Sequence, residues 1–361
     1  MAFALNTYPI TYRAKFSSGK WNEGEYLEKP HKTPEEEAQM NDEDRAALEF
    51  LRNCYGDMPL VNYTTQYGLG CFEGLKAFPQ KDGGLAIFRP DRNASRFTRS
   101  MEGLFMPPFP EKEFISACVE TVKRNMKLGF FPKYNNEWEK DSYMNADSVY
   151  IRPFSIAESG IGVNLSSEPY VMVINTPVSS YFSSGSSDAV VSDKIRATKN
   201  GTGWIKASSN YVISAIAKSQ ALKDGFMECV FLDAVHRKYI EEGSSCNIFF
   251  YLKSGELVTP EPGDTILHGI TRDSIIELAK DKGVKVSERQ IAIDEAMEEA
   301  KECFVSGTAA GATPLTSLTY NGKKALFNGG KTGDFTAEIR DTIKGIQYGK
   351  LPDAKGWMAH I

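Results

Sequence analysis

Apolar residues at helical spacing mark the clearest element of the chain, a helix expected over residues 113–127. One face of this helix would collect Phe114, Cys118, Val122 and Met126. Another helix start is predicted at Thr33, which precedes a proline and three glutamates, the order of an N-cap and an acidic first turn. Further helices are expected over residues 210–223, after residue 269 and over residues 294–301.

Short apolar runs rich in β-branched and aromatic residues predict strands between these helices. They cover residues 84–88, 149–156 and 170–176, and later residues 228–232, 247–251 and 303–306. The first half holds strands with an inserted helix, and no βα unit repeats along it. This pattern predicts an α+β domain there.

The length of 361 residues favours two domains over one core. Composition changes between Ser179 and Val190, where six serines and a glycine gather. We therefore predict a smaller N-terminal domain over residues 1–178, a linker over 179–190 and a larger C-terminal domain over 191–361. A cleft between two such domains would be the natural place for a small-molecule site.

Composition and charge exclude several classes of function. The chain has 41% hydrophobic and 25% charged residues, and its formal charge of -5 is not concentrated in basic blocks, which argues against nucleic-acid binding. No run approaches the ~20 apolar residues of a membrane span, and the first residues lack a secretory pattern, so a cytosolic location is expected. The six cysteines and four histidines are isolated, which argues against disulfides and metal sites.

The first segment with chemical potential surrounds Lys206. It lies among small residues and next to an amphipathic helix expected to bury Val212, Ile213, Ile216 and Ala217. Desolvation lowers the pKa of a lysine, and a neutral amine can form a Schiff base with an aldehyde. By residue type alone, a solvated surface lysine is the simpler interpretation.

Three further segments could bind charged groups. Glu241 and Glu242 precede two serines and a strand, where a carboxylate could pair with a protonated ring nitrogen, or where Asn247 could simply complete a polar turn. Thr271 stands at a helix start whose N–H groups could hold a phosphate, or could only cap that helix. The small residues after Ser306 could expose N–H groups to an anion or form a plain turn.

The order and wording of these segments resemble the branched-chain aminotransferases of fold type IV, a family of pyridoxal-phosphate enzymes. The resemblance covers nearly the whole chain. It rests on Phe72-Glu-Gly-Leu-Lys-Ala-Phe78, Phe88-Arg-Pro, Tyr150-Ile-Arg152-Pro, Lys206-Ala-Ser-Ser-Asn-Tyr211, Glu242-Gly-Ser-Ser-Cys-Asn-Ile-Phe, Gly269-Ile-Thr-Arg and Ser306-Gly-Thr-Ala. It implies a two-domain α+β / α/β fold of type IV, with pyridoxal 5'-phosphate bound between the domains, and a homodimer.

By position, the resemblance also implies a role for each matching residue. Lys206 would bind the cofactor covalently and move the proton during catalysis, Glu242 would bond the pyridine nitrogen, and Tyr211 the phenolic oxygen. The phosphate would be held by Arg96, Ser245, Ile270, Thr271 and Thr308. The substrate would be bound by Tyr67, Phe72, Tyr150, Arg152, Tyr181 and Ala309, with Arg152 and Tyr150 receiving the second carboxylate of glutamate or 2-oxoglutarate.

The implied reaction is the reversible transfer of the amino group of L-leucine, L-isoleucine or L-valine to 2-oxoglutarate. A D-amino-acid transaminase or an aminodeoxychorismate lyase would keep Lys206 and Glu242. It should not have both the motif that begins at Phe72 and the motif that begins at Tyr150. A cofactor-binding protein without turnover would not require the lysine together with Tyr211 and Glu242. Gly70, Cys71 and His268 depart from the family pattern and leave the finer substrate preference open.

Overall fold

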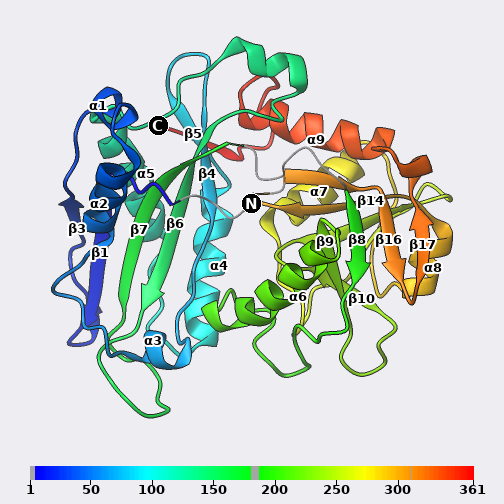
Figure 1. Cartoon of the computed structure of the whole chain (residues 1–361), viewed down its shortest axis with the longest axis horizontal. Helices are drawn as coiled ribbons and strands as arrows, with labels where there is room; N and C mark the ends of the chain where they lie inside the picture. The colour runs from blue at the N-terminus through cyan, green and yellow to red at the C-terminus, as the bar shows by residue number, and fades with distance from the viewer. Residues whose placement is uncertain (1–4, 180–186, 310) are drawn as a thin grey trace. The chain divides into compact units, whose positions relative to one another are not determined.

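The computed structural model describes residues 5–179, 187–309 and 311–361. The chain divides into two compact units (Figure 1). The first unit contains the described residues up to 179 together with residues 206–209 and 346–361. The second unit contains residues 187–205 and the described residues from 210 to 345.

The first unit is built on an antiparallel sheet of eight strands within the described residues. Their order is β18-β5-β4-β6-β7-β1-β2, and β3 pairs with the other end of β1. The bounds are β1 Ile10–Ser17, β2 Lys20–Trp21, β3 Glu25–Glu28, β4 Leu75–Pro79, β5 Leu85–Phe88, β6 Ser148–Ile156, β7 Tyr170–Val178 and β18 Met358–His360. The strands expected over 84–88, 149–156 and 170–176 are thus confirmed as β5, β6 and β7.

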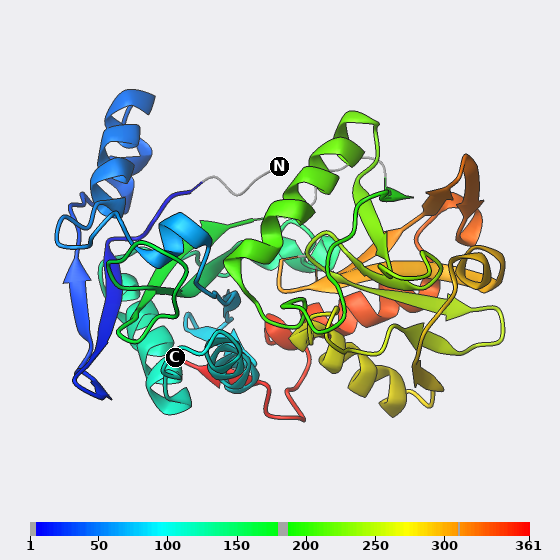
Figure 2. The ribbon, with the colours of Figure 1, turned by 90° about the horizontal axis from the view of Figure 1, so that it is seen from below.

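Helix α5 covers this sheet and confirms the helical periodicity of the sequence. It runs over Glu111–Lys127 and packs Phe114, Cys118 and Val122, all fully buried, toward β1 and β7. The start predicted at Thr33 is also correct, because Thr33 and Glu36 form a reciprocal capping box on α1. The helices of this unit are α1 Pro34–Ala38, α2 Asp42–Asn53, α3 Tyr63–Tyr67, α4 Pro90–Gly103, α5 and the 3₁₀ turn η1 Asn136–Asp141. In Figures 1 and 2, α1, α2 and β3 lie near the edge of the sheet where β1 is found.

Two five-stranded sheets form the second unit. One has the order β10-β9-β8-β16-β17 and the other the order β13-β12-β11-β14-β15. Their bounds are β8 Asp188–Val191, β9 Glu228–Leu232, β10 Ile240–Gly243, β11 Asn247–Leu252, β12 Leu257–Thr259, β13 Val286–Glu288, β14 Ala300–Gly307, β15 Gly311–Leu315, β16 Ser317–Tyr320 and β17 Lys323–Leu326. A common apolar core joins Val230 and Leu318 of the first sheet to Ile248, Phe250 and Val305 of the second.

Helices α6 Tyr211–Lys223, α7 Ile270–Asp281, α8 Ile293–Glu299 and α9 Asp334–Gln347 accompany these sheets, with 3₁₀ turns η2 Ser208–Asn210 and η3 Asn328–Gly330. Each of the first three was expected, although α8 ends before Lys301, which belongs to β14. The burial expected for α6 is correct for Ala217 and wrong for Val212 and Ile216. This helix packs its small residues Ser214, Ala217 and Ala221 inward, so Val212 and Ile216 remain exposed.

The division into units differs from the predicted domain bounds in two places. Residues 206–209 group with the first unit because Ala207 pairs with Cys71, and residues 346–361 do so because β18 pairs with β5. With these additions the first unit is the longer one, where a smaller N-terminal domain was expected. The predicted linker falls partly on residues 180–186, which lie outside the described residues, and its last part forms β8.

A buried carboxylate caps the N-terminus of helix α9, which begins at Asp334. Glu302 of β14 accepts hydrogen bonds from the N–H groups of Phe335 (3.2 Å) and Thr336 (2.8 Å) and from the Thr336 hydroxyl (2.8 Å). A Cβ at Gly333 would overlap the Glu302 carboxyl carbon at 1.9 Å, so glycine is required there.

No helix in the described part of the chain combines the length and apolar character needed to cross a membrane.

We predict that Glu302→Ala lowers the free energy of unfolding by about 2–4 kcal/mol, because it leaves buried N–H groups at the start of α9 without acceptors. Chemical unfolding followed by circular dichroism measures this loss. The exposed Glu298 on α8 provides the control, since Glu298→Ala should change stability by less than about 0.5 kcal/mol. Equal effects of the two substitutions would contradict the capping role.

Candidate active site

Lys206 is attached to the first unit by its backbone on both sides. Its carbonyl accepts the Phe72 N–H at 3.1 Å, and its own N–H donates to the Ser100 hydroxyl at 3.2 Å. Ser208 N–H donates to the Gly70 carbonyl at 2.9 Å, which completes a short antiparallel pairing. The side chain is half-buried, with Nζ 5.0 Å from the centre of the Phe72 ring. Lys206 is therefore not the solvated surface lysine of the simpler interpretation.

Arg96 lies one helical turn before Ser100 on α4, so both residues occupy the same face of that helix. Its guanidinium forms a bidentate ion pair with Glu73, with Nε to Oε1 at 2.6 Å and Nη2 to Oε2 at 2.8 Å. Glu73 is completely buried. Two parallel charge-assisted bonds fix the orientation of the guanidinium, so the position of Arg96 is set before any anion binds.

Phe72, Tyr150 and Arg152 form one cluster in the first unit. Arg152 Nη2 donates to the Tyr150 hydroxyl at 3.2 Å, and the guanidinium carbon lies 4.6 Å from the Phe72 ring centre. Its Nε is buried without a hydrogen-bond partner among the described residues. A Cβ at Gly74 would lie 2.1 Å from the Tyr150 oxygen, so glycine at this position makes room for the hydroxyl. The Phe72 ring is thus flanked by the cations of Lys206 and Arg152.

Tyr67 is not part of the cluster that the contacts define. Tyr67, on α3, is 43% exposed, and its hydroxyl accepts the Gly162 N–H at 2.7 Å. Tyr181 lies outside the described residues. The contacts therefore unite Lys206, Phe72, Tyr150 and Arg152, with Arg96 connected through Glu73 and Ser100.

In the second unit, Glu242 is held at the end of β10 by a buried ion pair. Its Oε1 lies 2.6 Å from Arg196 Nη2, and its Oε2 accepts the Leu267 N–H and the Asn247 amide, each at 3.3 Å. Asn247 also donates to the Leu267 carbonyl at 2.9 Å, which is the backbone contact expected of a polar turn. Glu241, its neighbour, forms no such ion pair within the described residues, and burial raises the pKa of its carboxyl.

The start of α7 presents backbone donors without a side-chain cap. The N-cap is Gly269, and Thr271 lies inside the helix, so Thr271 is not the cap. A Cβ at Gly269 would lie 1.9 Å from Asn247 Oδ1, which ties this helix start closely to the strand after Glu242. The first N–H groups of a helix favour an anion, and Ile270 and Thr271 carry two of them.

The remaining expected residues of the second unit lie at the edges of its elements. Tyr211 begins α6, Ser245 is exposed in the turn before β11, and Thr308 and Ala309 follow β14. Buried Glu228 supports the Ser245 turn, because it accepts the Ser244 N–H at 3.2 Å and pairs with Lys218 at 3.0 Å.

Four supporting residues were missed by the sequence analysis: Glu73, Ser100, Arg196 and Glu228. Ser100 stands four residues after Arg96, a helical spacing that could have been noticed. Glu73 belongs to the motif that begins at Phe72, but the motif alone does not predict its pairing with Arg96. Arg196 and Glu228 come together with their partners across strands and turns, and single-sequence spacing carries no signal of such pairs.

Comparison with known proteins adds independent findings. The family model described as amino-transferase class IV matches residues 70–318. The branched-chain-amino-acid aminotransferase of Mycolicibacterium smegmatis is 38% identical over 82% of this chain and 80% of its own length. Branched-chain-amino-acid aminotransferase 2 of Bacillus subtilis is 39% identical over 82% of this chain and 80% of its own length.

Solved structures give the same result. The branched-chain amino acid aminotransferase of T.th. with pyridoxamine 5'-phosphate matches with a TM-score of 0.71 at 30% identity, covering 84% of this chain and 93% of that one. A structure of the same name complexed with N-(5'-phosphopyridoxyl)-L-glutamate matches with a TM-score of 0.70 at 29% identity, with the same coverage.

We predict that Glu73→Ala lowers the free energy of unfolding by about 3–5 kcal/mol, because it leaves the Arg96 guanidinium buried without its partner. The double variant Glu73→Leu with Arg96→Met should lose less, since it removes both charges. Chemical unfolding of both variants tests the pair. A double variant less stable than Glu73→Ala would show that the ion pair is not the source of the loss.

Proposed function

Because the chain belongs to the class IV aminotransferases, and within them to the branched-chain-amino-acid aminotransferases, we propose that it transfers the amino group of L-leucine, L-isoleucine or L-valine to 2-oxoglutarate. The products would be the branched 2-oxo acid and L-glutamate. The observation that carries this proposal is Lys206, a half-buried amine whose backbone is fixed from both sides and which lies against Phe72.

Pyridoxal 5'-phosphate is the cofactor of this family, and the fold is that of fold type IV. The donor set present in the chain fits such a group. Arg96 is a pre-oriented guanidinium for the phosphate, the uncapped start of α7 offers the N–H groups of Ile270 and Thr271, and Ser245 and Thr308 offer hydroxyls. When bound, the cofactor supplies an electron sink that stabilises negative charge at the substrate Cα.

Each residue then has a defined task. Lys206 would hold the cofactor through Nζ, and its amine would accept and return the proton at the substrate Cα. Glu242 accepts a hydrogen bond from the protonated ring nitrogen, and Arg196 keeps this carboxylate oriented. Tyr211 bonds the phenolic oxygen. Arg196 is the addition that the structure makes to the set expected from the sequence.

The substrate part of the proposal explains how one pocket can accept two kinds of side chain. Phe72 and Tyr150 offer aromatic surface for the aliphatic side chain, and the Arg152–Tyr150 pair offers charge-assisted donors for the second carboxylate of 2-oxoglutarate. Tyr67, Tyr181 and Ala309 complete the proposed substrate residues, by their positions in the family motif. The L-glutamate adduct of the T.th. relative supports glutamate as the second amino acid.

The proposal includes a homodimer. Its support is an exposed apolar surface in the first unit, where Gly160 N–H donates to the Val61 carbonyl at 3.4 Å and brings two loops together. These loops expose Leu60, Val61, Ile161, Val163 and Leu165, and Val163 is 95% exposed. An apolar patch of this kind is typical of an interaction surface.

The expectation of a cytosolic location stays a prediction.

The first test follows the visible absorption band of the bound cofactor in the purified holoprotein. We expect L-leucine to abolish the band and 2-oxoglutarate to restore it, whereas D-alanine should have no effect. Lys206→Ala should lose the band and at least about 10³-fold in turnover, and the exposed Lys199→Ala should retain both. A response to D-alanine alone would assign the chain to the D-amino-acid branch instead.

The second test concerns Arg152. We expect Arg152→Ala to raise the KM for 2-oxoglutarate by about 10–100-fold, because a charge-assisted pair to the second carboxylate is lost, and to change the KM for leucine by less than about 3-fold. Steady-state kinetics with each substrate varied in turn measures this. Arg124→Ala, at an exposed position on α5, is the matched control. Equal losses for both substrates would remove Arg152 from its assigned role.

A further inference from the structure

A cavity with both polar and apolar walls lies in the first unit, apart from all residues assigned to cofactor or substrate. Its volume is about 520 Å³, and its walls come from residues 6–8, helices α1 and α2, residues 129–132 and the ends of two strands. Most of the residues that line it precede residue 70, where the match to the family model begins. The cavity is therefore largely a property of the N-terminal part of this chain.

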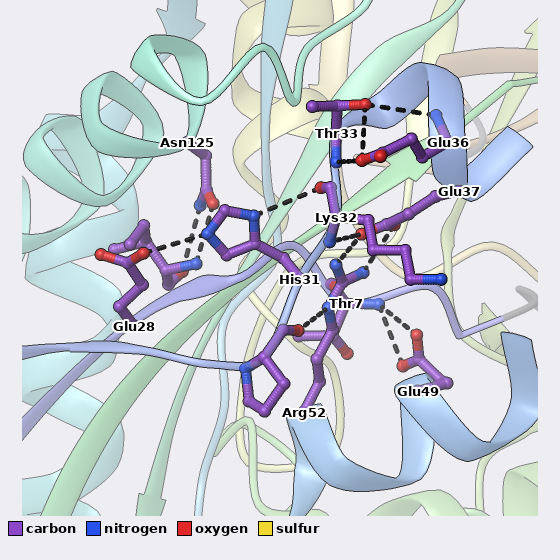
Figure 3. A network of polar contacts seen from close by, with 12 residues as sticks. Thr7, Glu28, His31, Lys32, Thr33, Glu36, Glu37, Glu49, Arg52 and Asn125 are labelled. Carbon is purple, nitrogen blue, oxygen red and sulfur yellow. Dashed lines mark hydrogen bonds and ion pairs between the residues drawn. The ribbon is translucent and has the colours of Figure 1, made fainter. Parts of the chain in front are cut away.

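The walls are held in place by a buried arginine. Arg52 of α2 is 1% exposed, donates from Nε to the Pro30 carbonyl at 3.1 Å and from Nη1 to the Thr7 carbonyl at 3.0 Å, and pairs with Glu37 of α1. Figure 3 shows these contacts, with Glu49 on the other side of Thr7. Because every one of these bonds is internal, the shape of the cavity does not depend on a ligand.

Apart from the Arg52–Glu37 pair, the charged residues that line the cavity are the carboxylates Glu49 and Asp147 and the cation Arg45. Arg52 is already neutralised by Glu37. Glu49 accepts only neutral donors, namely the Thr7 N–H at 3.0 Å and the Asn53 amide at 2.7 Å. Asp147 has no side-chain partner among the described residues, and partial burial raises the pKa of its carboxyl.

The other cation at the cavity, Arg45, does not balance these carboxylates. It donates to the Met40 carbonyl at 2.8 Å and lies 3.9 Å from the exposed Asp42. Its charge is therefore directed along α2 and toward solvent. Two carboxylates that line the cavity, Glu49 and Asp147, therefore have no cationic partner among the described residues.

The side chain of Tyr8 also lines this space. Tyr8 is 6% exposed and lines the cavity, and within the described residues its hydroxyl has no hydrogen-bond partner. Burial raises its pKa, and the nearby Asp147 carboxylate raises it further. The Tyr8 ring packs on Phe130 with centroids 5.6 Å apart, and Phe131 and Leu48 extend this apolar wall.

We propose that this cavity binds a small organic ammonium ion, whose N–H groups donate to Asp147, Glu49 and the Tyr8 oxygen and whose hydrocarbon part packs on Phe130 and Leu48. An anion would meet two uncompensated carboxylates. A metal ion is disfavoured, because the described residues hold no group of three His, Cys, Asp or Glu side chains suited to bind one. The apolar wall equally favours an organic cation over a hydrated one.

The probe that tests this is piperidinium, a secondary ammonium that does not compete with Lys206 for the cofactor as a primary amine would. N,N-dimethylpiperidinium has the same ring and charge but no N–H, so it isolates the hydrogen bonds. By isothermal titration calorimetry on the holoprotein, we expect saturable binding of piperidinium and at least about tenfold weaker binding of its dimethyl analogue.

Three variants locate the binding. Asp147→Asn and Tyr8→Phe should each weaken piperidinium binding by about tenfold, whereas Glu35→Gln, an exposed acidic position on α1 that does not line the cavity, should leave it unchanged. Tyr8→Phe keeps the ring on Phe130, so it retains the fold and separates lost binding from misfolding.

Three results would overturn the proposal. One is the absence of piperidinium binding to the holoprotein. Another is equal affinity for the wild-type chain and both cavity variants. The third is displacement of the probe by Mg²⁺ but not by Na⁺ at equal ionic strength, which would identify a site for an inorganic cation. None of these measurements depends on transamination, so the proposal and the proposed function can fail separately.

Discussion

The short antiparallel pairing between residues 70–72 and 206–208 is the constraint on which the candidate site depends. The chain before and after residues 206–209 belongs to the second unit, yet these four residues group with the first. Two backbone hydrogen bonds, Phe72 to Lys206 and Ser208 to Gly70, achieve this. A lysine in an unpaired loop would lose backbone as well as side-chain entropy on reaching a reactive position, whereas here the backbone part is already fixed.

Charge is arranged differently in the two units. In the first, Lys206, Arg96 and Arg152 are cations, and Glu73 is the carboxylate seen to pair with one of them among the described residues. The excess of positive charge suits ligands that carry a phosphate and carboxylates. In the second unit, Glu242 is matched by Arg196. This balanced pair provides an oriented acceptor without adding net charge.

Much of the fold could be predicted from local pattern, because α5, α7, β6 and β9 depend on periodicity and on residues close in sequence. The proposed site residues rest on sequence motifs. The contacts that hold those residues could not be predicted, since Glu73 with Arg96 and Arg196 with Glu242 are joined only by the tertiary fold. The contact-based division into units differs from the predicted domain bounds for the same reason. Pairing of Ala207 with Cys71 and of β18 with β5 leaves no trace in composition.

The position of β18 has a consequence for how the chain assembles. This strand, Met358–His360, pairs with residues 86–88 of β5 across some of the longest sequence separations that the chain offers. During synthesis, the sheet of the first unit therefore stays incomplete until residues 358–360 have emerged, after the described strands of the second unit have been made. Until then, β5 remains an open sheet edge in the nascent protein.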